Sequence, residues 1–390
     1  MDRTTVEERY MKVTKMCSML TGIWPDQSKF SQLVTRTIIY IISVWSLFTQ
    51  VAQLVSFFNL DAVIEQICFL FLISGILIKQ GNYIINAAQY KMLLNTIWED
   101  WSKDRAKDEL EIMVEYAERT AFFSRMYFGV GMVCSGCFAQ QALSPIILDI
   151  ILPTNETRDV LYIYPAYYLI DDRKYRSLII LHLTYVTIVA YYVFVGCDTS
   201  YVCVVQHACG QIAVAGHRFK NAISDLCVVK QLSDVQDEHY ERVLHSIQAH
   251  QHAINYLKII ENCHVTYLCI CVAFVMVAFS VTLLKVASYE EISAPLIKDG
   301  VFLSSQLIHI LFLTAQGQFV LNSNDEIAES IYDASWYNTN KETQLLFVLA
   351  LRSCLSPPIL SAGGLLTLNL ETFAEIIKGS VSYFTVLKSS

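Results

Sequence analysis

Long apolar runs dominate the pattern of hydrophobic and polar positions along this chain. Five runs contain no charged residue and reach about 20 residues, the length that a helix needs to cross a bilayer. They are Thr37–Leu60, Met126–Leu148, Ser177–Cys197, Asn262–Leu284 and Gly300–Asn324.

Two further runs could span a membrane only if some charge is accepted within them. Gln66–Ile78 is charge-free and extends through Tyr90 if Lys79 is tolerated. Ser353–Leu370 continues to Leu387 if Glu371, Glu375 and Lys378 are included. We therefore predict an all-α integral membrane protein with seven transmembrane helices. A soluble all-helical protein is the alternative, but buried helices seldom repeat such long charge-free runs five times.

Lysine and arginine in the connections predict the orientation. Three connections are rich in basic residues: these include Arg3, Arg9, Lys12, Lys15 and Lys29 before the first span, Lys91, Lys103, Arg105, Lys107 and Arg119 between the second and third, and Arg218, Lys220, Lys230, Arg242 and Lys258 between the fourth and fifth. The first-to-second link has none, and the fifth-to-sixth has Lys298 together with Lys285 at the end of the fifth span. The third-to-fourth connection has four, offset by five acids. We expect a cytoplasmic N-terminus and an extracellular C-terminus, the reverse of G-protein-coupled receptors.

One glycosylation sequon agrees with this topology. Asn155-Glu156-Thr157 lies in the third-to-fourth connection, which is predicted to be extracellular. We expect no cleavable signal in the first thirty residues, because they are charged and lack an apolar core.

The cytoplasmic connections are themselves predicted to be helical. Leu93–Arg119 and His207–Lys258 carry apolar residues at helical spacing among many charges. This pattern indicates that they extend the neighbouring spans, and it predicts a packed cytoplasmic anchor layer where subunits meet. Asn324–Asn338 predicts a separate acidic amphipathic helix, capped by Asn324 or Asp325, with a break around residues 339–341.

These elements predict the organisation of the chain. It comprises a cytoplasmic N-terminal segment (1–32), spans one to four (33–206) with an outer loop (146–177), a cytoplasmic helical extension (207–258), spans five and six (259–324), the cytoplasmic helix of segment seven (325–341) and its pore-lining helix (342–390).

Composition supports a membrane protein and argues against an enzyme. The chain has 54% hydrophobic and 16% charged residues, against about 25% charged in soluble domains. Its twelve cysteines lie mostly in apolar runs and are expected to pack as small hydrophobic residues, Cys134 and Cys137 included. His245, His250 and His252 match no common ligand spacing, so no metal is expected. No phosphate-binding loop or nucleophile motif indicates a cofactor or catalysis.

The last segment, "KGSVSYFTVLKSS", has an unusual helical face for a membrane span. Small or polar residues share one side with a valine, while Val381, Phe384 and Leu387 take the other. Such a stripe suits a helix that lines water or packs closely on a neighbour. The residues on the stripe are Gly379, Ser382, Tyr383, Val386 and Ser390.

Motifs in the last seventy residues resemble the insect odorant receptor family. G-protein-coupled receptors match in span number only, since Glu8-Arg9-Tyr10 precedes the first span and no Asn-Pro-x-x-Tyr ends the seventh. The resemblance rests on the Ala328, Tyr332 and Trp336 spacing, Leu351-Arg352, Pro358–Gly364, Leu370–Phe373 and the ending Tyr383–Leu387.

The resemblance implies an odorant-gated cation channel in the plasma membrane of olfactory neurons. The expected partners are odorant co-receptor subunits in a heterotetramer, a small volatile ligand and membrane lipids, with no nucleic acid. The fourth-to-fifth connection is much shorter than in the co-receptor, which implies a ligand-binding tuning subunit. The resemblance also places a hydrophobic gate at Val386. A self-sufficient gustatory-like channel is the alternative, although the chain lacks the gustatory ending. A transporter or a metabotropic receptor is a more distant one.

The family places its ligand pocket in the outer halves of spans two, three, four and six. Helical spacing selects one face of each as candidates, with ordinary packing as the competing interpretation. His182 and His309 are the most informative, because histidine within a bilayer requires a polar partner or cavity; if both face the pocket, a ligand with a hydroxyl, carbonyl or ester is expected. The candidates are Cys68, Phe71, Leu72, Gly75, Met132, Ser135, Gly136, Ala139, Leu181, His182, Tyr185, Ile188, Phe302, Ser305, Gln306 and His309.

Overall fold

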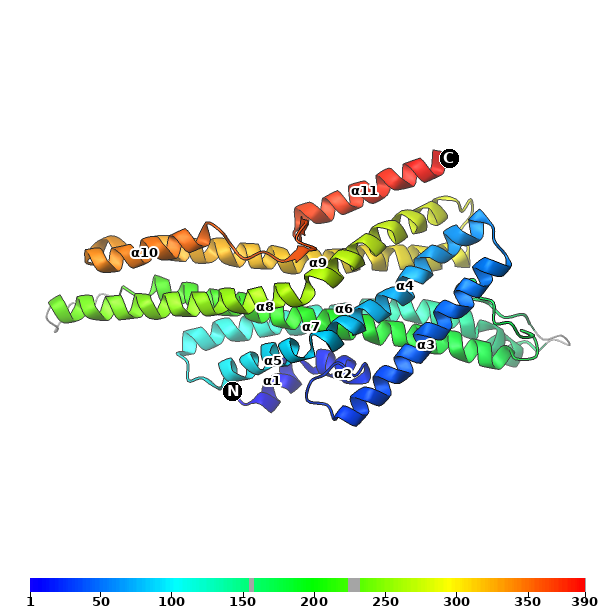
Figure 1. Cartoon of the computed structure of the whole chain (residues 1–390), viewed down its shortest axis with the longest axis horizontal. Coiled ribbons are helices and arrows are strands. Elements are labelled where there is room, and N and C mark those ends of the chain that lie inside the picture. Colours follow the sequence, from blue (N-terminus) through cyan, green and yellow to red (C-terminus); the bar gives the residue numbers. More distant parts are fainter. Residues whose placement is uncertain (154–157, 224–231, 390) are drawn as a thin grey trace.

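A computed structural model describes residues 1–153, 158–223 and 232–389 of the chain. It is an elongated bundle of helices, which confirms the predicted all-α class (Figure 1). In chain order the helices are α1 (Arg3–Tyr10), α2 (Lys12–Leu20), α3 (Lys29–Ser56), α4 (Leu60–Ile85), α5 (Ala87–Ser102), α6 (Lys107–Ile151), α7 (Arg176–Lys220), α8 (Leu232–Ala287), α9 (Ala294–Asp333), α10 (Lys341–Cys354) and α11 (Leu370–Ser389). A two-stranded hairpin, β1 (Ser361–Ala362) and β2 (Leu366–Thr367), separates α10 from α11.

The helix α7 forms the centre of the bundle. It packs against α2, α4, α6, α8 and α9, and every residue from Val195 to Ile212 is buried. A helix that is buried on all sides must bury its polar residues too, so they need partners within the protein. Gln206 meets this need by donating from its amide to Gln316 Oε1 of α9 at 2.8 Å.

The first long helix buries polar residues and exposes apolar ones, which is the reverse of a helix on the surface of a soluble protein. On α3, Ser43, Ser46 and Gln50 are buried, while Trp45 and Phe48 are exposed. Apolar side chains gain nothing by facing water, but they are well solvated by lipid tails. In the part of the chain that is described, six helices (α3, α4, α6, α7, α8 and α9) are long and apolar enough to cross a membrane.

Polar contacts fix the end of the bundle remote from α11. Asp100 of α5 accepts hydrogen bonds from His207 Nε2 of α7 at 3.0 Å and from Lys103 Nζ at 2.6 Å. Burial alone would raise the pKa of Asp100, but its hydrogen bonds, with His207 foremost, hold that pKa well below the usual range. Arg218 of α7 binds Glu109 of α6 through two hydrogen bonds of 2.7 Å.

Two expected helices are divided differently in the structure. The predicted helix Leu93–Arg119 is two helices, because α5 ends at Ser102 and α6 begins at Lys107. The predicted separate helix at Asn324–Asn338 is wrong, because α9 runs without a break to Asp333. The reason is that Asn324 caps nothing: its side-chain amide donates to the Cys354 carbonyl of α10 at 3.3 Å.

The segment 342–390, predicted to hold the pore-lining helix, consists of α10, the hairpin and α11. Pro357 and Pro358 follow the end of α10, and proline disfavours helical geometry in the residue before it. Gly363 and Gly364 then form the hairpin turn with φ of 70° each, a conformation that favours glycine. The hairpin pairs Ser361 with Thr367 and Ala362 with Leu366.

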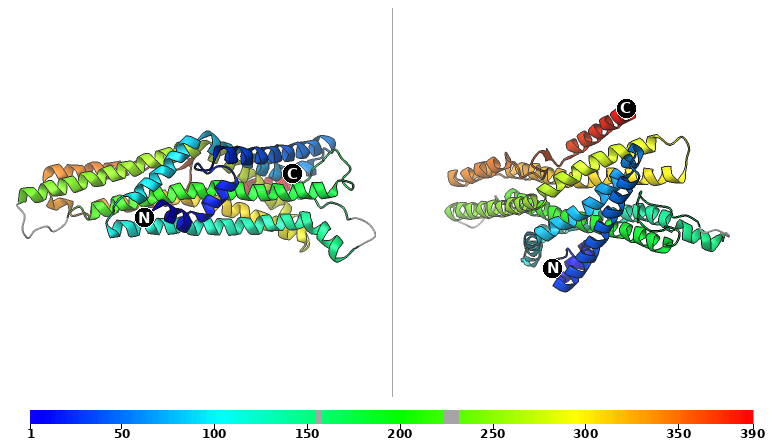
Figure 2. Two further views of the ribbon diagram at one scale, coloured as in Figure 1. Left: turned by 90° about the horizontal axis from the view of Figure 1, so that it is seen from below. Right: turned by 45° about the vertical axis from the view of Figure 1, so that its right-hand side comes forward.

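Backbone contacts hold the hairpin against α8 and α9. Gly363 N–H donates to the Val265 carbonyl of α8 at 2.9 Å. On the other side, the Leu368 carbonyl oxygen lies only 1.8 Å from the position that a Cβ atom on Gly317 of α9 would occupy. From this anchor α11 runs along the edge of the bundle, packed on α8 and α9 (Figures 1 and 2).

We expect Gly317→Ala to destabilise the protein by about 3 kcal/mol, because the new methyl group must displace backbone. Gly300→Ala is the matched control on the same helix, since a Cβ there meets nothing within 4 Å. The measurement is the thermal unfolding midpoint of the detergent-purified protein. Equal midpoints for the two variants would contradict the close approach.

Candidate functional site

An internal cavity of about 180 Å³ lies between five helices of the bundle. An engineered apolar cavity of about 150 Å³ holds a benzene molecule, so this one suits a small organic molecule. Its walls are mostly aromatic and aliphatic. The lining residues are Cys68, Phe69, Phe71, Leu72, Ile73 and Gly75 of α4; Tyr127, Val130, Gly131, Cys134, Ser135 and Phe138 of α6; Val186, Thr187, Ala190, Tyr191, Phe194 and Val195 of α7; Cys271, Phe274, Val275 and Ala278 of α8; Phe302, Ser305, Gln306 and His309 of α9; and Ile163 and Tyr164 of the α6–α7 connection.

Aromatic rings pack directly on one another in these walls. Phe69 of α4 stacks on Phe302 of α9, with ring centroids 5.9 Å apart and planes 3° from parallel. Phe138 of α6 contacts both rings edge-on, at 6.1 Å and 5.4 Å. These arrangements are favourable for aromatic pairs, so three helices are held together around the cavity by rigid side chains.

The connection between α6 and α7 covers one end of the cavity. Ile163 and Tyr164 contribute to the lining. Tyr164 donates its hydroxyl to Ser46 Oγ of α3 at 3.2 Å. Gln66 of α4 donates its amide to the carbonyls of Gln50 and Pro165, both at 2.8 Å. The covering segment is therefore tied to α3 and α4.

A charged pair lies behind the polar wall of the cavity. Lys79 of α4 forms an ion pair with Asp198 of α7, and both side chains are 0% exposed. Tyr127 of α6 donates its hydroxyl to Asp198 Oδ2 at 2.8 Å, and the Tyr127 hydroxyl oxygen lies 2.6 Å from His309 Nδ1 of α9. Four helices thus meet in one hydrogen-bonded network.

Aromatic rings complete the surroundings of Lys79. Its ammonium nitrogen lies 4.9 Å from the ring centroid of Phe194 and 5.6 Å from that of Tyr267. Ring faces attract cations, most strongly where water is absent. Phe194 also lines the cavity, so a cavity side chain touches the buried cation directly.

The family model described as 7tm Odorant receptor matches residues 59–381, which is most of the chain. This chain belongs to the odorant receptor family. Among curated proteins it is similar to odorant receptor Or2 of Anopheles gambiae, with 19% identity over 82% of each chain. Odorant receptor Or1 of the same organism is 22% identical over 64% of each chain.

Solved structures show the same fold. The olfactory receptor OR5 from Machilis hrabei in complex with eugenol matches with a TM-score of 0.82, 12% identity and 99% coverage of both chains. A second structure of that receptor matches with a TM-score of 0.80, 13% identity and 97% coverage. This chain is therefore a multi-pass membrane receptor of olfaction, in a class of proteins that are not enzymes.

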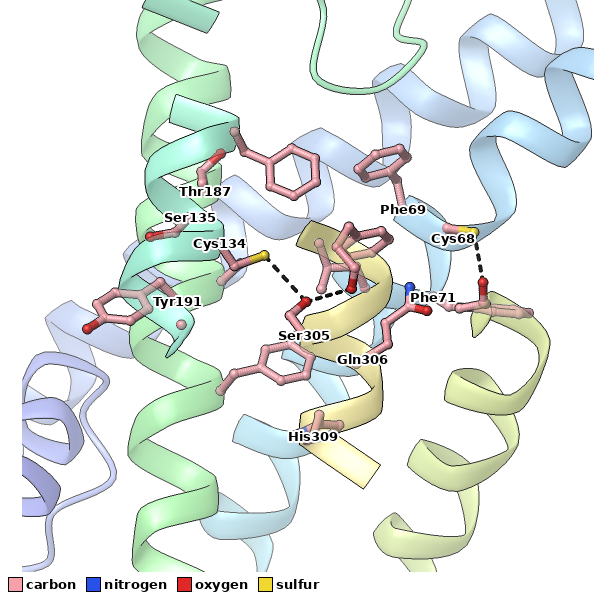
Figure 3. A pocket seen from close by; sticks show the side chains of 18 of the residues that line it. Cys68, Phe69, Phe71, Cys134, Ser135, Thr187, Tyr191, Ser305, Gln306 and His309 are labelled. Atoms are coloured by element: carbon pink, nitrogen blue, oxygen red, sulfur yellow. Dashed lines mark hydrogen bonds between the residues drawn. The ribbon is translucent and has the colours of Figure 1, made fainter. Parts of the chain in front are cut away.

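Nine of the sixteen candidate residues of this odorant receptor lie at the cavity. All four candidates of α4 and all four of α9 line it, together with one of the four on α6. Figure 3 shows several of these side chains gathered around the space between the helices. The nine are Cys68, Phe71, Leu72, Gly75, Ser135, Phe302, Ser305, Gln306 and His309.

The other seven candidates do not line the cavity. On α7 the chosen face points outward: Leu181 is 64% exposed, and Tyr185 and Ile188 are exposed as well. Val186, Thr187, Ala190 and Tyr191 take their place. On α6, Met132 and Gly136 are exposed and Ala139 is half-buried, all outside the lining.

The two histidines have different surroundings. His182 lies under the α6–α7 connection, with Nδ1 2.8 Å from the Tyr168 hydroxyl and Nε2 3.5 Å from Ser46 Oγ. Only His309 lines the cavity. The prediction that both histidines face one pocket is therefore not met, because His182 lies outside the cavity.

Sequence reasoning missed the contribution of α8 and the buried ion pair. Cys271, Phe274, Val275 and Ala278 line the cavity at the i, i+3, i+4, i+7 spacing that defines one helical face, so the pattern was present. The sequence feature that indicated the Lys79–Asp198 pair was Asp198 itself, because an acid that directly follows an apolar run needs a buried cation.

On α11, the predicted stripe is turned away from the bundle. Ile376 and Ser380 face α8 and α9, and Ser380 donates its hydroxyl to the Met276 carbonyl at 3.4 Å. Ser382, Tyr383 and Val386 are exposed, Val386 by 61%. Gly379 lies at the border, where a Cβ would meet Met276 Cε at 3.6 Å. Asn155 and Ser390 lie outside the described residues.

The described residues contain no cluster of metal-ligating side chains. Of the three α8 histidines considered for a metal site, His245 and His252 are exposed and His250 is buried. Burial lowers the pKa of His250 to about 4, because the protonated ring would lose its hydration.

We expect Lys79→Met to destabilise the receptor by about 3–5 kcal/mol, because it leaves Asp198 buried without its cation. The double variant Lys79→Met/Asp198→Asn should recover part of this loss, since it removes the charge as well. Lys107→Met is the control, because Lys107 and its partner Glu111 are both largely exposed. Thermal unfolding midpoints in detergent measure all three; a double variant no more stable than Lys79→Met would contradict the pairing.

Acid should destabilise the receptor through His250. The unfolded chain binds a proton at this ring below about pH 6.5, whereas the folded one does so only near pH 4, so stability is lost as pH falls between these values. His250→Gln should reduce the loss by about 2 kcal/mol at pH 5. The check is the unfolding midpoint at pH 7.5 and pH 5, with the exposed His252→Gln as control; an unchanged acid response in His250→Gln would refute it.

Proposed function

We propose that this chain is the odorant-binding subunit of a heteromeric ligand-gated cation channel, which opens when a small volatile occupies the cavity. The observation that carries the proposal is the cavity itself, which lies between five helices and is lined by aromatic rings with few polar groups. Ligand pockets are typically apolar with a small number of placed polar groups. The nine candidate residues at the cavity are the proposed ligand contacts.

The proposed topology has seven spans, with the N-terminus in the cytoplasm and the C-terminus outside. Six long apolar helices supply the first six spans, and α11, at 20 residues, is long enough to be the seventh. The α6–α7 connection, with its tyrosines and Asn155, would then lie outside, so we propose that Asn155 is glycosylated.

The remote end of the bundle would form the cytoplasmic anchor layer between subunits. The helices α6 to α9 have 45, 45, 56 and 40 residues, about twice what a bilayer requires. Their extra turns gather with α5 and α10 at one end (Figure 1). The Asp100 and Glu109 contacts would hold this layer rigid while the membrane part moves.

The exposed stripe of α11 would line the pore in a tetramer with co-receptor subunits. Exposed serine and tyrosine on a membrane helix favour contact with water or with another subunit. In this arrangement Val386 forms part of an apolar ring that blocks ions by dewetting when the channel is closed. The rival interpretation is that the stripe serves only to pack subunits together.

One turn of α8 would couple the cavity to α11. Phe274 and Val275 line the cavity, and the next residue, Met276, contacts Gly379 and Ser380 of α11. A ligand that shifts this turn therefore shifts the pore helix. The ligand favours opening only to the extent that its affinity for the open state exceeds its affinity for the closed state.

The alternative is a gustatory-like channel that conducts without a co-receptor. No contact within one subunit separates the two, because both would use the same cavity and the same α11. The connection between the fourth and fifth spans is shorter than that expected of the co-receptor, and this favours assignment as a tuning subunit. We place the heteromer in the plasma membrane of the dendrites of olfactory neurons, surrounded by lipid.

In cells, odorant-evoked current should require this chain and the co-receptor together, tested with a broad odorant panel. Val386→Ser should raise current in the absence of odorant, because a polar ring wets more readily. Val381→Ser, on the other side of α11, is the matched control and should leave the basal current unchanged.

Three results would reject parts of the proposal. Current from this chain alone supports the gustatory-like alternative. Responses abolished by blocking G proteins reject a channel. Equal basal currents in the two serine variants reject Val386 as a gate.

A further inference from the structure

The hydroxyl groups around the cavity all donate to partners within the protein. Ser305 donates to the Phe302 carbonyl at 2.7 Å, Thr187 to the Leu183 carbonyl at 3.0 Å and Tyr191 to the Phe128 carbonyl at 3.1 Å. Tyr127, Ser135 and Tyr164 donate to Asp198, to the Met132 carbonyl and to Ser46. A ligand that only accepts hydrogen bonds finds no free hydroxyl proton here.

The network behind the wall fixes the proton on His309. Tyr127 has one hydroxyl proton, and the Asp198 carboxylate can only accept, so that proton belongs to the Tyr127–Asp198 bond of 2.8 Å. Tyr127 must then accept from His309 Nδ1 at 2.6 Å. Asp198 Oδ2 lies only 3.3 Å from the same nitrogen, which also requires a proton on it.

The imidazole of His309 is neutral in this arrangement. Lys79 already balances the charge of Asp198, so a second proton would leave a net positive charge in the apolar interior, at a high cost in free energy. Nε2 therefore carries a lone pair and no proton. It is buried and has no hydrogen-bond partner among the described residues.

Gln306 presents a second acceptor one turn away on the same face of α9 (Figure 3). Thr282 donates its hydroxyl to the Ala278 carbonyl at 2.7 Å and so accepts from Gln306 Nε2 at 3.2 Å. This orients the amide and leaves Oε1 buried without a partner in the described chain. The second amide hydrogen of Gln306 is a donor that a hydroxyl can also use.

We propose that His309 Nε2, supported by Gln306 Oε1, makes this cavity selective for odorants that carry a hydrogen-bond donor, namely alcohols and phenols. The proposal rests on the proposed function, because it assumes that the ligand enters this cavity. It narrows the sequence expectation, since a carbonyl or an ester leaves the His309 acceptor unsatisfied. A buried acceptor left without a partner disfavours binding.

Only a small adjustment is needed to reach the two acceptors. His309 and Gln306 both line the cavity, but they are only 6% and 7% exposed. The inference therefore requires a shift of either side chain that exposes its free atom to a ligand, and such shifts are common on binding. Nδ1 stays on Tyr127, so the Lys79–Asp198 pair acts through Tyr127 as a positioning group for the acceptor.

The test uses isomers that differ only in their hydrogen-bonding group. Benzyl alcohol and anisole form one pair, hexanol and pentyl methyl ether a second, and benzaldehyde and hexanal serve as carbonyl probes. Binding is measured as thermal stabilisation of the purified receptor, and gating as current with the co-receptor. We expect each alcohol to act at about tenfold lower concentration than its ether or aldehyde, as one hydrogen bond provides.

His309→Phe should bring this ratio close to one by weakening the alcohols while leaving the ethers unchanged. His182→Phe is the matched control, because that histidine lies outside the cavity, and the ratio should persist. A ratio that survives in His309→Phe, a preference for the aldehydes, or no binding by any probe overturns the inference. Alcohol-selective binding without current in any odorant test would instead reject the channel function and leave the selectivity standing.

Discussion

The ion pair between Lys79 and Asp198 is the constraint on which the middle of this receptor depends. Each charge alone would be very costly in an interior without water, and removing either one leaves the other uncompensated. The pair is maintained by an aromatic cage on the cation and by a tyrosine on the anion. Because its members come from α4 and α7, with Tyr127 from α6 and His309 from α9, four helices must keep one arrangement for the charges to stay paired.

The same network determines whether the polar atoms at the cavity wall donate or accept hydrogen bonds. An isolated histidine could present either tautomer to a ligand, and an isolated glutamine either end of its amide. Here Asp198 imposes the proton position through Tyr127, and Thr282 imposes the amide orientation. The atoms that remain without partners are acceptors in both cases. Discrimination between ligands therefore follows from charge balance behind the wall as much as from the shape of the wall.

How far the sequence could predict this site differs from helix to helix. On α9 the polar residues Ser305, Gln306 and His309 mark the inner face, because polar groups avoid lipid, and their placement at the cavity was predicted. On α7 the faces toward lipid and toward the cavity are equally apolar, so the pattern could not separate Leu181 from Val186. The all-α class and the long spans followed from charge-free runs alone.

The contacts that organise the chain near α11 could not be predicted, because they are made by the backbone. Nothing in the pattern around Gly317 indicates that the Leu368 carbonyl crosses there. Pro357, Pro358, Gly363 and Gly364 did signal an interruption, but not that it docks on α8 and α9. Long-range pairing of this kind depends on three-dimensional closeness that local periodicity does not encode.

That docking determines how a small ligand could act on a distant helix. The α11 helix is fixed at its start by the hairpin and touches the bundle again at Met276, in the turn of α8 that also lines the cavity. Between these two contacts Thr372 and Ile376 are buried against the bundle. Under the proposed function, a shift of this turn of α8 would reach α11 through Met276, whereas the Lys79–Asp198 network could remain intact. The charged core holds four helices in one arrangement, whereas α11 packs on α8 and α9 along one side and leaves Ser382, Tyr383 and Val386 of its predicted stripe exposed, so the fold combines a fixed centre with a last helix that remains accessible to a partner.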